Sequence, residues 1–208
     1  DPSPVVILTG GDPFMRRDLF DLVAHGIGLG LRMSLSPSVT KLANRRVFMR
    51  LRDLGVSRMS LSLDGSSAGV HDSFRGVPGS FADTVGRMHD ALEVGLSIQV
   101  NTTVSRHNLK DLPAMADLLT TYSRMALWDL FFLVPTGRAL QQDVISALEH
   151  EEVLRWLCNG VSSLPFGIKT TLGQHYRRVV LQSAARDGKS LGEVWSRTAR
   201  ASTNDGKG

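Results

Sequence analysis

The sequence predicts an α/β protein built on a parallel sheet. Short apolar runs that end in small polar residues alternate with segments of helical periodicity, and this unit recurs about every 30 residues, the spacing of βα units. Each helix would connect neighbouring parallel strands as a right-handed crossover. The pattern is compatible with an open doubly wound sheet and with a full or partial (βα) barrel.

Six strands are expected, one for each apolar run. They cover residues 5–9, 29–35, 58–63, 96–104, 127–134 and 168–172. Helical periodicity predicts six helices over residues 16–25, 39–54, 81–94, 109–122, 144–157 and 175–185. Gly26, Gly55 and Gly95 follow three of these helices and are typical of helix ends. A long loop is expected before residue 81.

Composition and charge exclude several classes of protein. The 208 residues are 42% hydrophobic and 21% charged, as in an ordinary globular domain. The net charge is +4 and the pI is about 9.6, but no run of five cations and no interleaved aromatic platform indicates nucleic-acid binding. One cysteine excludes a disulfide framework, and no apolar stretch reaches the ~20 residues of a membrane helix. We expect a cytoplasmic protein.

The two ends of the chain suggest a piece of a longer protein. The sequence opens on Asp1 rather than methionine and enters a strand-like run almost at once, without the basic region of a signal peptide. We expect one domain over residues 1–190 and a linker or frayed tail over residues 191–208.

Small polar residues follow most of the predicted strands. Gly10-Gly11-Asp12-Pro13 is the most specific of these segments, because two glycines directly after a strand let the backbone approach a ligand closely. The alternative is a tight turn in which Asp12 caps a helix and Pro13 takes its first position. In a barrel the strand ends converge on one mouth, so the shared polarity favours a barrel.

The third predicted strand carries polar groups on one face. Alternation places Ser60, Ser62 and Asp64 together, with Met59 and its apolar neighbours opposite. The segment 71–76 and the glycine-serine pair at 79–80 follow it. A turn at Asp64 and a helix cap at residue 80 explain part of this pattern, but they do not explain the serines of the strand.

Several of these segments resemble radical S-adenosylmethionine (SAM) enzymes. Residues 10–13 are similar to the Gly-Gly-Glu-Pro motif of that superfamily, and Ser62-Leu63-Asp64-Gly65 with residues 71–76 resembles its fourth-strand segment. Residues 99–108 and 134–138 are similar to its fifth and sixth strands. The resemblance covers about residues 4–185 and is strongest to the molybdenum-cofactor, pyrroloquinoline-quinone and haem-pathway maturases, many of which carry a SPASM domain with auxiliary clusters.

The resemblance implies a TIM-like partial (βα)6 barrel, the radical SAM core, whose first strand and cluster loop would precede residue 1. It implies reductive cleavage of SAM at a [4Fe-4S] cluster to a 5′-deoxyadenosyl radical, which abstracts hydrogen from a substrate. An electron donor of the flavodoxin or ferredoxin type is implied as a partner, and the substrate, a small molecule or a peptide, is not identified.

The resemblance also implies roles for particular residues. Carbonyls of Gly10 and Gly11, with Asp12 of the same turn and its neighbour Pro13, would meet the methionyl ammonium of SAM. Arg75 would bind the methionyl carboxylate. The remaining contacts would be Ser62 and Asp64 with the ribose hydroxyls, Asn101 and Thr103 on the floor of the site, and Val134 against the adenine.

The sequence departs from the family in two places. Asp12 stands where the motif has glutamate, and the Cys-x-x-x-Cys-x-x-Cys cluster motif is absent, so no metal ligand is assigned in this chain. Cys158 lies in an apolar helical segment and is expected to be a small core residue. The histidines have no metal-ligand spacing, and His150-Glu151-Glu152 is expected to be a solvated helix face.

Three functions are weighed. The chain is either part of an active radical SAM enzyme, inactive by itself, or a non-catalytic module that binds SAM or another nucleoside and has lost its cluster. A conventional barrel enzyme that binds a phosphorylated substrate through Arg138 ranks below these, because no lysine or carboxylate pair is evident at the strand ends.

Overall fold

The computed structural model describes residues 4–122, 124–137, 139–160, 163–188 and 201–204. Its strands form one hydrogen-bonded sheet in which the strand order follows the chain order, from β1 to β7. The pairs β1–β2, β2–β3, β5–β6 and β6–β7 are parallel. The predicted parallel sheet with crossover helices is therefore confirmed. The chain divides into two compact units, which are described in turn.

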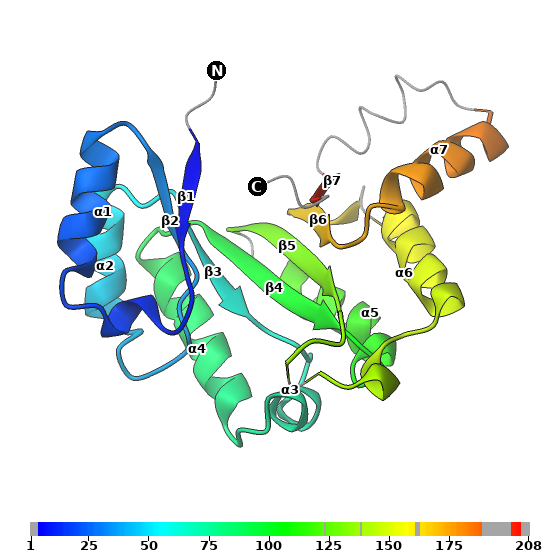
Figure 1. Cartoon of the computed structure of the whole chain (residues 1–208), viewed down its shortest axis with the longest axis horizontal. Coiled ribbons are helices and arrows are strands. Elements are labelled where there is room, and N and C mark those ends of the chain that lie inside the picture. The colour runs from blue at the N-terminus through cyan, green and yellow to red at the C-terminus, as the bar shows by residue number, and fades with distance from the viewer. Residues whose placement is uncertain (1–3, 123, 138, 161–162, 189–200, 205–208) are drawn as a thin grey trace. The chain divides into compact units, whose positions relative to one another are not determined.

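The first unit holds β1 to β3, the start of β4, and the helices between them (Figure 1). Its elements are β1 (Val5–Leu8), the 3-10 helix η1 (Pro13–Met15), α1 (Leu19–Gly28), β2 (Arg32–Leu35), α2 (Arg45–Leu54), β3 (Arg58–Ser62), α3 (Ala68–Arg75) and α4 (Ser80–Glu93). Helix α1 packs on α2, and α2 packs on α4. Apolar side chains of β2, β3 and α2, among them Leu35, Phe48 and Leu61, are fully buried between these layers.

Two helices of the first unit begin or end differently from the sequence prediction. Helix α2 begins at Arg45 rather than residue 39, because the Asn44 side chain accepts a hydrogen bond from the Val47 N–H and caps the helix there. Gly55 ends α2 in the left-handed conformation, as predicted. Gly26, expected after the end of α1, lies inside it: a β-carbon there would come within 2.4 Å of the Met33 sulfur, so the glycine lets β2 approach.

A helix occupies the segment that the sequence predicted as a long loop. Residues 68–75 form α3, which ends at Gly76 in the left-handed conformation. The segment contains Gly69 and only two large apolar residues, so its helical periodicity is weak. The structure compensates by connecting α3 to the next helix. Asp72 accepts hydrogen bonds from the N–H groups of Gly79 and Phe81 and from the Ser80 hydroxyl, at 2.6 to 3.0 Å.

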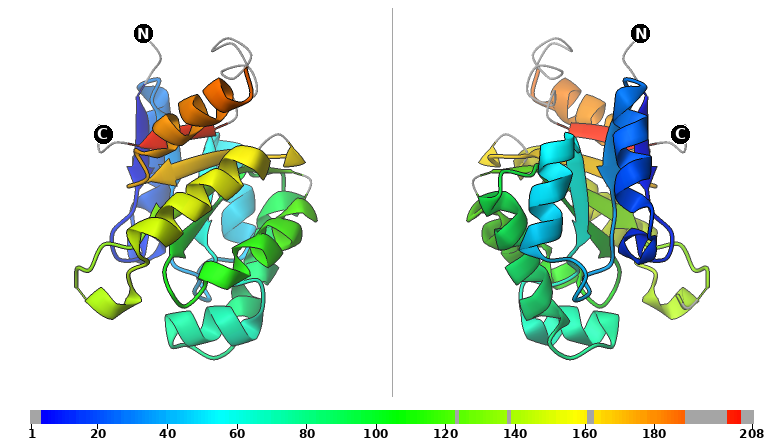
Figure 2. Two further views of the ribbon diagram at one scale, coloured as in Figure 1. Left: turned by 90° about the vertical axis from the view of Figure 1, so that its right-hand side faces the viewer. Right: turned by 90° about the vertical axis from the view of Figure 1, so that its left-hand side faces the viewer.

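The second unit consists of residues 64–66, 101–123 and 127–208, so it includes most of β4 and of β5. Its elements are β4 (Ile98–Val104), the 3-10 helix η2 (Leu109–Asp111), α5 (Leu112–Thr120), β5 (Met125–Phe132), the 3-10 helix η3 (Gln141–Asp143), α6 (Ala147–Gly160), β6 (Gly167–Thr171), α7 (Tyr176–Arg186) and β7 (Ala201–Asn204). Helices α6 and α7 pack against each other (Figure 2). Residues 191–208 were predicted as a linker or frayed tail, whereas residues 201–204 pair with β6 as a strand.

Trp128 organises the core of the second unit. Its side chain is fully buried, its indole N–H donates to the Thr102 hydroxyl at 2.8 Å, and its ring meets that of Trp156 edge to face at 6.2 Å. Trp128 belongs to β5 and Trp156 to α6, so this contact identifies the face of β5 that α6 covers. No helix among the described residues is long and apolar enough to cross a membrane.

Candidate functional site

The turn after β1 combines unusual backbone geometry with open space. Gly10 and Gly11 have φ angles of +84° and +58°, which L residues rarely adopt, and a β-carbon on either would meet nothing within 4 Å. Asp12 caps η1 by accepting the Phe14 N–H, and it accepts the Thr40 hydroxyl on its second oxygen, both at 3.1 Å. The predicted cap is confirmed, and Pro13 takes the first helical position. Both glycines are exposed.

Ser62 lies at the same edge of the sheet as this turn. Strands β1, β2 and β3 are parallel neighbours, so their carboxyl ends lie along one edge. Ser62 ends β3 and is half-buried, while Met59 and Leu61 on the opposite face are fully buried, as the alternation predicted. The first unit therefore presents a glycine turn and a serine hydroxyl along one edge.

Arg75 ends helix α3 and its side chain is exposed; its guanidinium carbon lies 5.8 Å from the centre of the Phe74 ring. Asp72, on the same helix, caps α4 by accepting hydrogen bonds, and these bonds, led by the one from the Phe81 N–H, lower the pKa of Asp72. His71 is buried, with its ring edge-on to Phe81 at 6.1 Å. Arg75 is thus exposed at the end of α3, while Asp72 caps α4 and His71 packs in the interior.

In the second unit, Asp64 belongs to a buried hydrogen-bond network. Its carboxylate accepts the N–H of Thr103 at 2.7 Å, and its carbonyl accepts the Asn108 amide at 3.0 Å. The same Asn108 amide donates to the Thr103 carbonyl, while its oxygen accepts the N–H of Ser105. Asp64 and Asn108 are both fully buried. Asp64 therefore fixes the start of its loop to β4, a role that sequence analysis did not predict.

Asn101 and Thr103 share one face of β4, and both are half-buried. Thr102 between them is fully buried and bonded to Trp128, so Asn101 and Thr103 point to the face that Trp128 does not occupy. Val134, two residues beyond β5, is 45% exposed and thus accessible. Arg138, the candidate phosphate-binding residue, lies outside the described residues.

A charged pair lies on neighbouring strands of the second unit, where sequence analysis had found none. Asp129 of β5 faces Lys169 of β6 in the sheet register, with 2.9 Å between the carboxylate and the ammonium. The other carboxylate oxygen of Asp129 accepts the Thr171 hydroxyl at 2.9 Å. Burial raises the pKa of Asp129, although Lys169 and Thr171 act against this. The sequence feature that could have indicated this pair is an aspartate inside the otherwise apolar run 127–132, because a charged residue in a buried strand requires a partner.

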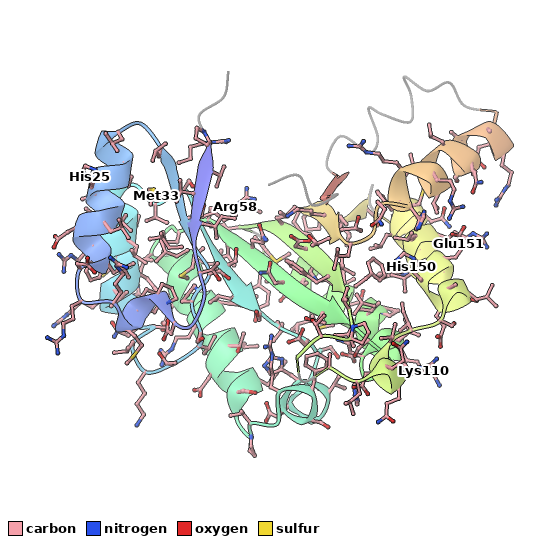
Figure 3. All side chains as sticks on the ribbon, in the orientation of Figure 1. His25, Met33, Arg58, Lys110, His150 and Glu151 are labelled. Carbon is pink, nitrogen blue, oxygen red and sulfur yellow. The ribbon has the colours of Figure 1, made fainter. Side chains whose placement is uncertain are left out.

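The second unit also contains a hollow of about 520 Å³ beside α6. It is lined by residues of the start of α6 and of the segment after β6, including His150 and Glu151, which Figure 3 labels. The His150 ring lies 4.0 Å from that of Phe132, and burial, with the nearby His175, lowers the pKa of His150. His150 is therefore partly packed rather than part of a fully solvated face, and Glu151 is paired with Arg178.

The described residues do not form a metal site. They contain no group of three His, Cys, Asp or Glu side chains that could hold an ion. Cys158, the single cysteine of the sequence, is half-buried on α6.

Comparison with known proteins connects these features. Residues 1–119 match the Radical SAM superfamily. The chain is 42% identical over 190 residues to an AdoMet-dependent heme synthase from Oleidesulfovibrio alaskensis, covering 89% of this chain and 48% of the relative. It is 36% identical over 186 residues to an AdoMet-dependent heme synthase from Methanosarcina barkeri, covering 89% and 53%. The chain thus spans about half the length of the curated relatives it matches.

A solved structure shows the same fold. Streptococcus suis SuiB bound to S-adenosylmethionine superposes with a TM-score of 0.61 at 13% sequence identity, over 80% of this chain and 39% of that one. At this identity the likeness concerns the fold alone. It confirms the predicted α/β partial barrel and removes the open doubly wound sheet as the alternative.

Proposed function

The chain belongs to the radical SAM superfamily, and on this premise we propose that it is the SAM-binding core of an enzyme that produces haem or a related iron porphyrin. The haem-synthase relatives support the porphyrin assignment, because their similarity extends over 89% of the chain. The glycine turn after β1 supports the SAM assignment. The substrate we propose is an iron porphyrin that carries carboxylate side chains.

The observation that carries SAM binding is the geometry of Gly10 and Gly11. Both residues are exposed, have a left-handed backbone and would meet nothing within 4 Å of an added β-carbon, and we propose that their carbonyl groups accept the ammonium group of SAM. Both oxygens of Asp12 already accept hydrogen bonds inside the protein. We therefore assign the methionyl ammonium chiefly to the two glycine carbonyls, with Asp12 and Pro13 holding the turn in shape.

The other proposed SAM contacts are side chains that differ in their exposure. Arg75 is exposed and can bind the methionyl carboxylate with two parallel hydrogen bonds, and Ser62 offers a hydroxyl to the ribose. In the second unit Asn101, Thr103 and the exposed Val134 are accessible for ligand contact. Asp64, fully buried and bonded to the Thr103 N–H, supports the site through Thr103.

The iron–sulfur cluster of the family does not fit the residues of this chain. One cysteine is present, and the described residues hold no three-ligand group. We propose that the cluster ligands come from sequence outside these 208 residues. In this family the cluster and SAM together supply hydrogen-abstracting radical chemistry, and the residues described above bind and orient the reactants for it.

The proposal is tested with the full-length protein that contains this chain. With a reconstituted cluster, SAM, a reductant and iron coproporphyrin III, we expect 5′-deoxyadenosine and a changed porphyrin, both followed by chromatography. Release of 5′-deoxyadenosine without any porphyrin change would keep the family chemistry and reject the porphyrin. SAM binding without cleavage, in a protein that holds no cluster, would instead support a non-catalytic binding module.

A further inference from the structure

The charged pair of Asp129 and Lys169 is the feature that the SAM assignments leave unused. The two residues face each other across β5 and β6, and the carboxylate holds both the Lys169 ammonium and the Thr171 hydroxyl at 2.9 Å. The Asp129 side chain is fully buried, whereas the Lys169 side chain is 26% exposed. The ammonium is therefore the half of the pair that reaches open space.

The pair lies on the face of the strands that α6 does not cover. Trp128 and Leu130, the neighbours of Asp129 in β5, are fully buried, and Trp128 packs on Trp156 of α6. Side chains alternate along a strand, so Asp129 points the other way. Lys169 and Thr171 of β6 lie on the same face as Asp129, because they alternate with Ile168 and Thr170, which are fully buried on the other face.

Stability alone does not account for this pair. Removing two charges from water costs several kcal/mol per ion, and apolar residues of similar volume are often equally good or better at such a position. An ammonium group has three donors. Among the described residues, the carboxylate of Asp129 is the only one that pairs with the Lys169 ammonium, so this group has further donors for a ligand.

We propose that Lys169 binds a carboxylate of the porphyrin substrate, and that Asp129 and Thr171 are positioning residues that hold the ammonium in place. This inference rests on the proposed function. Haem and its porphyrin precursors carry carboxylate side chains, for which a fixed ammonium is a complementary partner. SAM is a poorer candidate, because its sulfonium and ammonium groups would be repelled by a second cation.

The hydrogen bond to Asp129 gives Lys169 an advantage over a lysine whose side chain is mobile. A lysine side chain loses rotamer entropy when it is ordered. The hydrogen bond to Asp129 orders it before the ligand arrives, so less of that cost falls on binding. Thr171 occupies the second oxygen of Asp129 and fixes the plane of the carboxylate.

The test compares iron coproporphyrin III with its tetramethyl ester, which keeps the ring and iron but has no carboxylates. Absorbance titrations of the full-length protein should show tighter binding of the acid than of the ester. Lys169→Met should weaken acid binding about 10–100-fold, the size expected for one charge-assisted hydrogen bond, and leave ester binding unchanged. Lys169→Arg should restore most of the acid affinity.

Two further variants keep the result interpretable. Lys110→Met removes an exposed lysine of η2 in the same unit (labelled in Figure 3) and should leave both affinities unchanged. The double variant Asp129→Leu/Lys169→Met removes both charges, leaves no unpaired carboxylate, and should lose acid binding as Lys169→Met does. Asp129→Asn should lower the acid-to-ester ratio, a quantity that a purely structural role does not change.

The failures of the two proposals differ. If the unaltered protein binds neither porphyrin, the porphyrin assignment falls and takes the role of Lys169 with it. If acid and ester bind equally, or if Lys169→Met and the double variant keep the acid-to-ester ratio of the unaltered protein, the proposed function stands and the inference about Lys169 is overturned.

Discussion

The end of β1 and the neighbouring strands β5 and β6 present two chemically different surfaces. The turn at Gly10 and Gly11 offers main-chain groups in an open setting, and its geometry depends on the absence of side chains. The β5–β6 face offers a side-chain charge held by a buried carboxylate. The first surface suits a zwitterionic ligand that needs acceptors, and the second suits an anionic one. The two surfaces therefore differ in the kind of ligand group that each can complement.

The largest effect on stability is expected when one charge of the Asp129–Lys169 pair is removed and the other remains. Lys169→Met leaves the fully buried Asp129 carboxylate without its ammonium partner and should lower the free energy of unfolding by about 3 kcal/mol. The double variant Asp129→Leu/Lys169→Met should cost less than about 1 kcal/mol, because neither charge remains. Urea denaturation measures both. Equal losses in the two variants would contradict the account of the pair.

On the first surface, the strongest side-chain effect should come from Arg75. Arg75→Ala should weaken SAM binding about 10–30-fold, as expected when a charged hydrogen-bond partner of a carboxylate is lost. Arg46→Ala, which removes an exposed arginine of α2, is the matched control and should have no effect. Calorimetry with SAM measures both affinities, and an unchanged value for Arg75→Ala would remove this residue from the site.

Each unit also contains a closely packed glycine, and the two differ in how much stability an alanine should cost. At Gly173 a β-carbon would lie 2.9 Å from both the Phe132 ring and the Thr170 β-carbon, which are rigid neighbours, so Gly173→Ala should cost about 1–3 kcal/mol. At Gly26 it would lie 2.4 Å from the sulfur of the buried Met33 side chain, which can change rotamer, and the gain in helix propensity offsets part of the crowding. Gly26→Ala should therefore cost less stability than Gly173→Ala. Thermal denaturation distinguishes them, and the reverse order would contradict the packing described.

The smallest expected effect is a pH dependence from His150. Burial lowers its pKa below the ordinary 6.5 in the folded state, so the unfolded chain binds the proton more readily. The stabilising contribution of the neutral ring is complete above about pH 6.5 and is lost as the pH falls below it. His150→Phe should therefore reduce the fall in melting temperature between pH 7.5 and pH 5.5. An identical fall in both proteins would show that His150 does not contribute.

Much of the fold followed from periodicity, and the exceptions have local causes. The six predicted strands all form, because each is an apolar run bounded by small polar residues. Helix α3 was missed because its order depends on Asp72 capping the next helix, a contact that no periodic pattern signals. Strand β7 was missed because its four residues are small and polar and depend on pairing with β6.

The left-handed turn after β1 was predictable from the sequence, whereas side-chain contacts between distant segments were not. Gly10 and Gly11 stand out in the sequence because few structures other than a left-handed turn require two glycines after a strand. The hydrogen bond that the buried Asp64 accepts from the Thr103 N–H was not predicted, because it joins residues 39 positions apart in the sequence. The pairing of Asp129 with Lys169 likewise depends on the β5–β6 register, which the sequence alone does not define.

The most direct test of the account is the affinity of the full-length protein for SAM when one methyl group is added at each of two glycines. Gly11→Ala places a side chain at φ +58° in the open turn, and Gly28→Ala adds the same methyl group at a helix position with open space around it. We predict a loss of SAM affinity of about 5–30-fold for Gly11→Ala and none for Gly28→Ala. The free alanine turn relaxes away from the left-handed conformation, and about 1–2 kcal/mol of strain must be regained when SAM binds. Equal affinities in the two variants would contradict SAM binding at this turn.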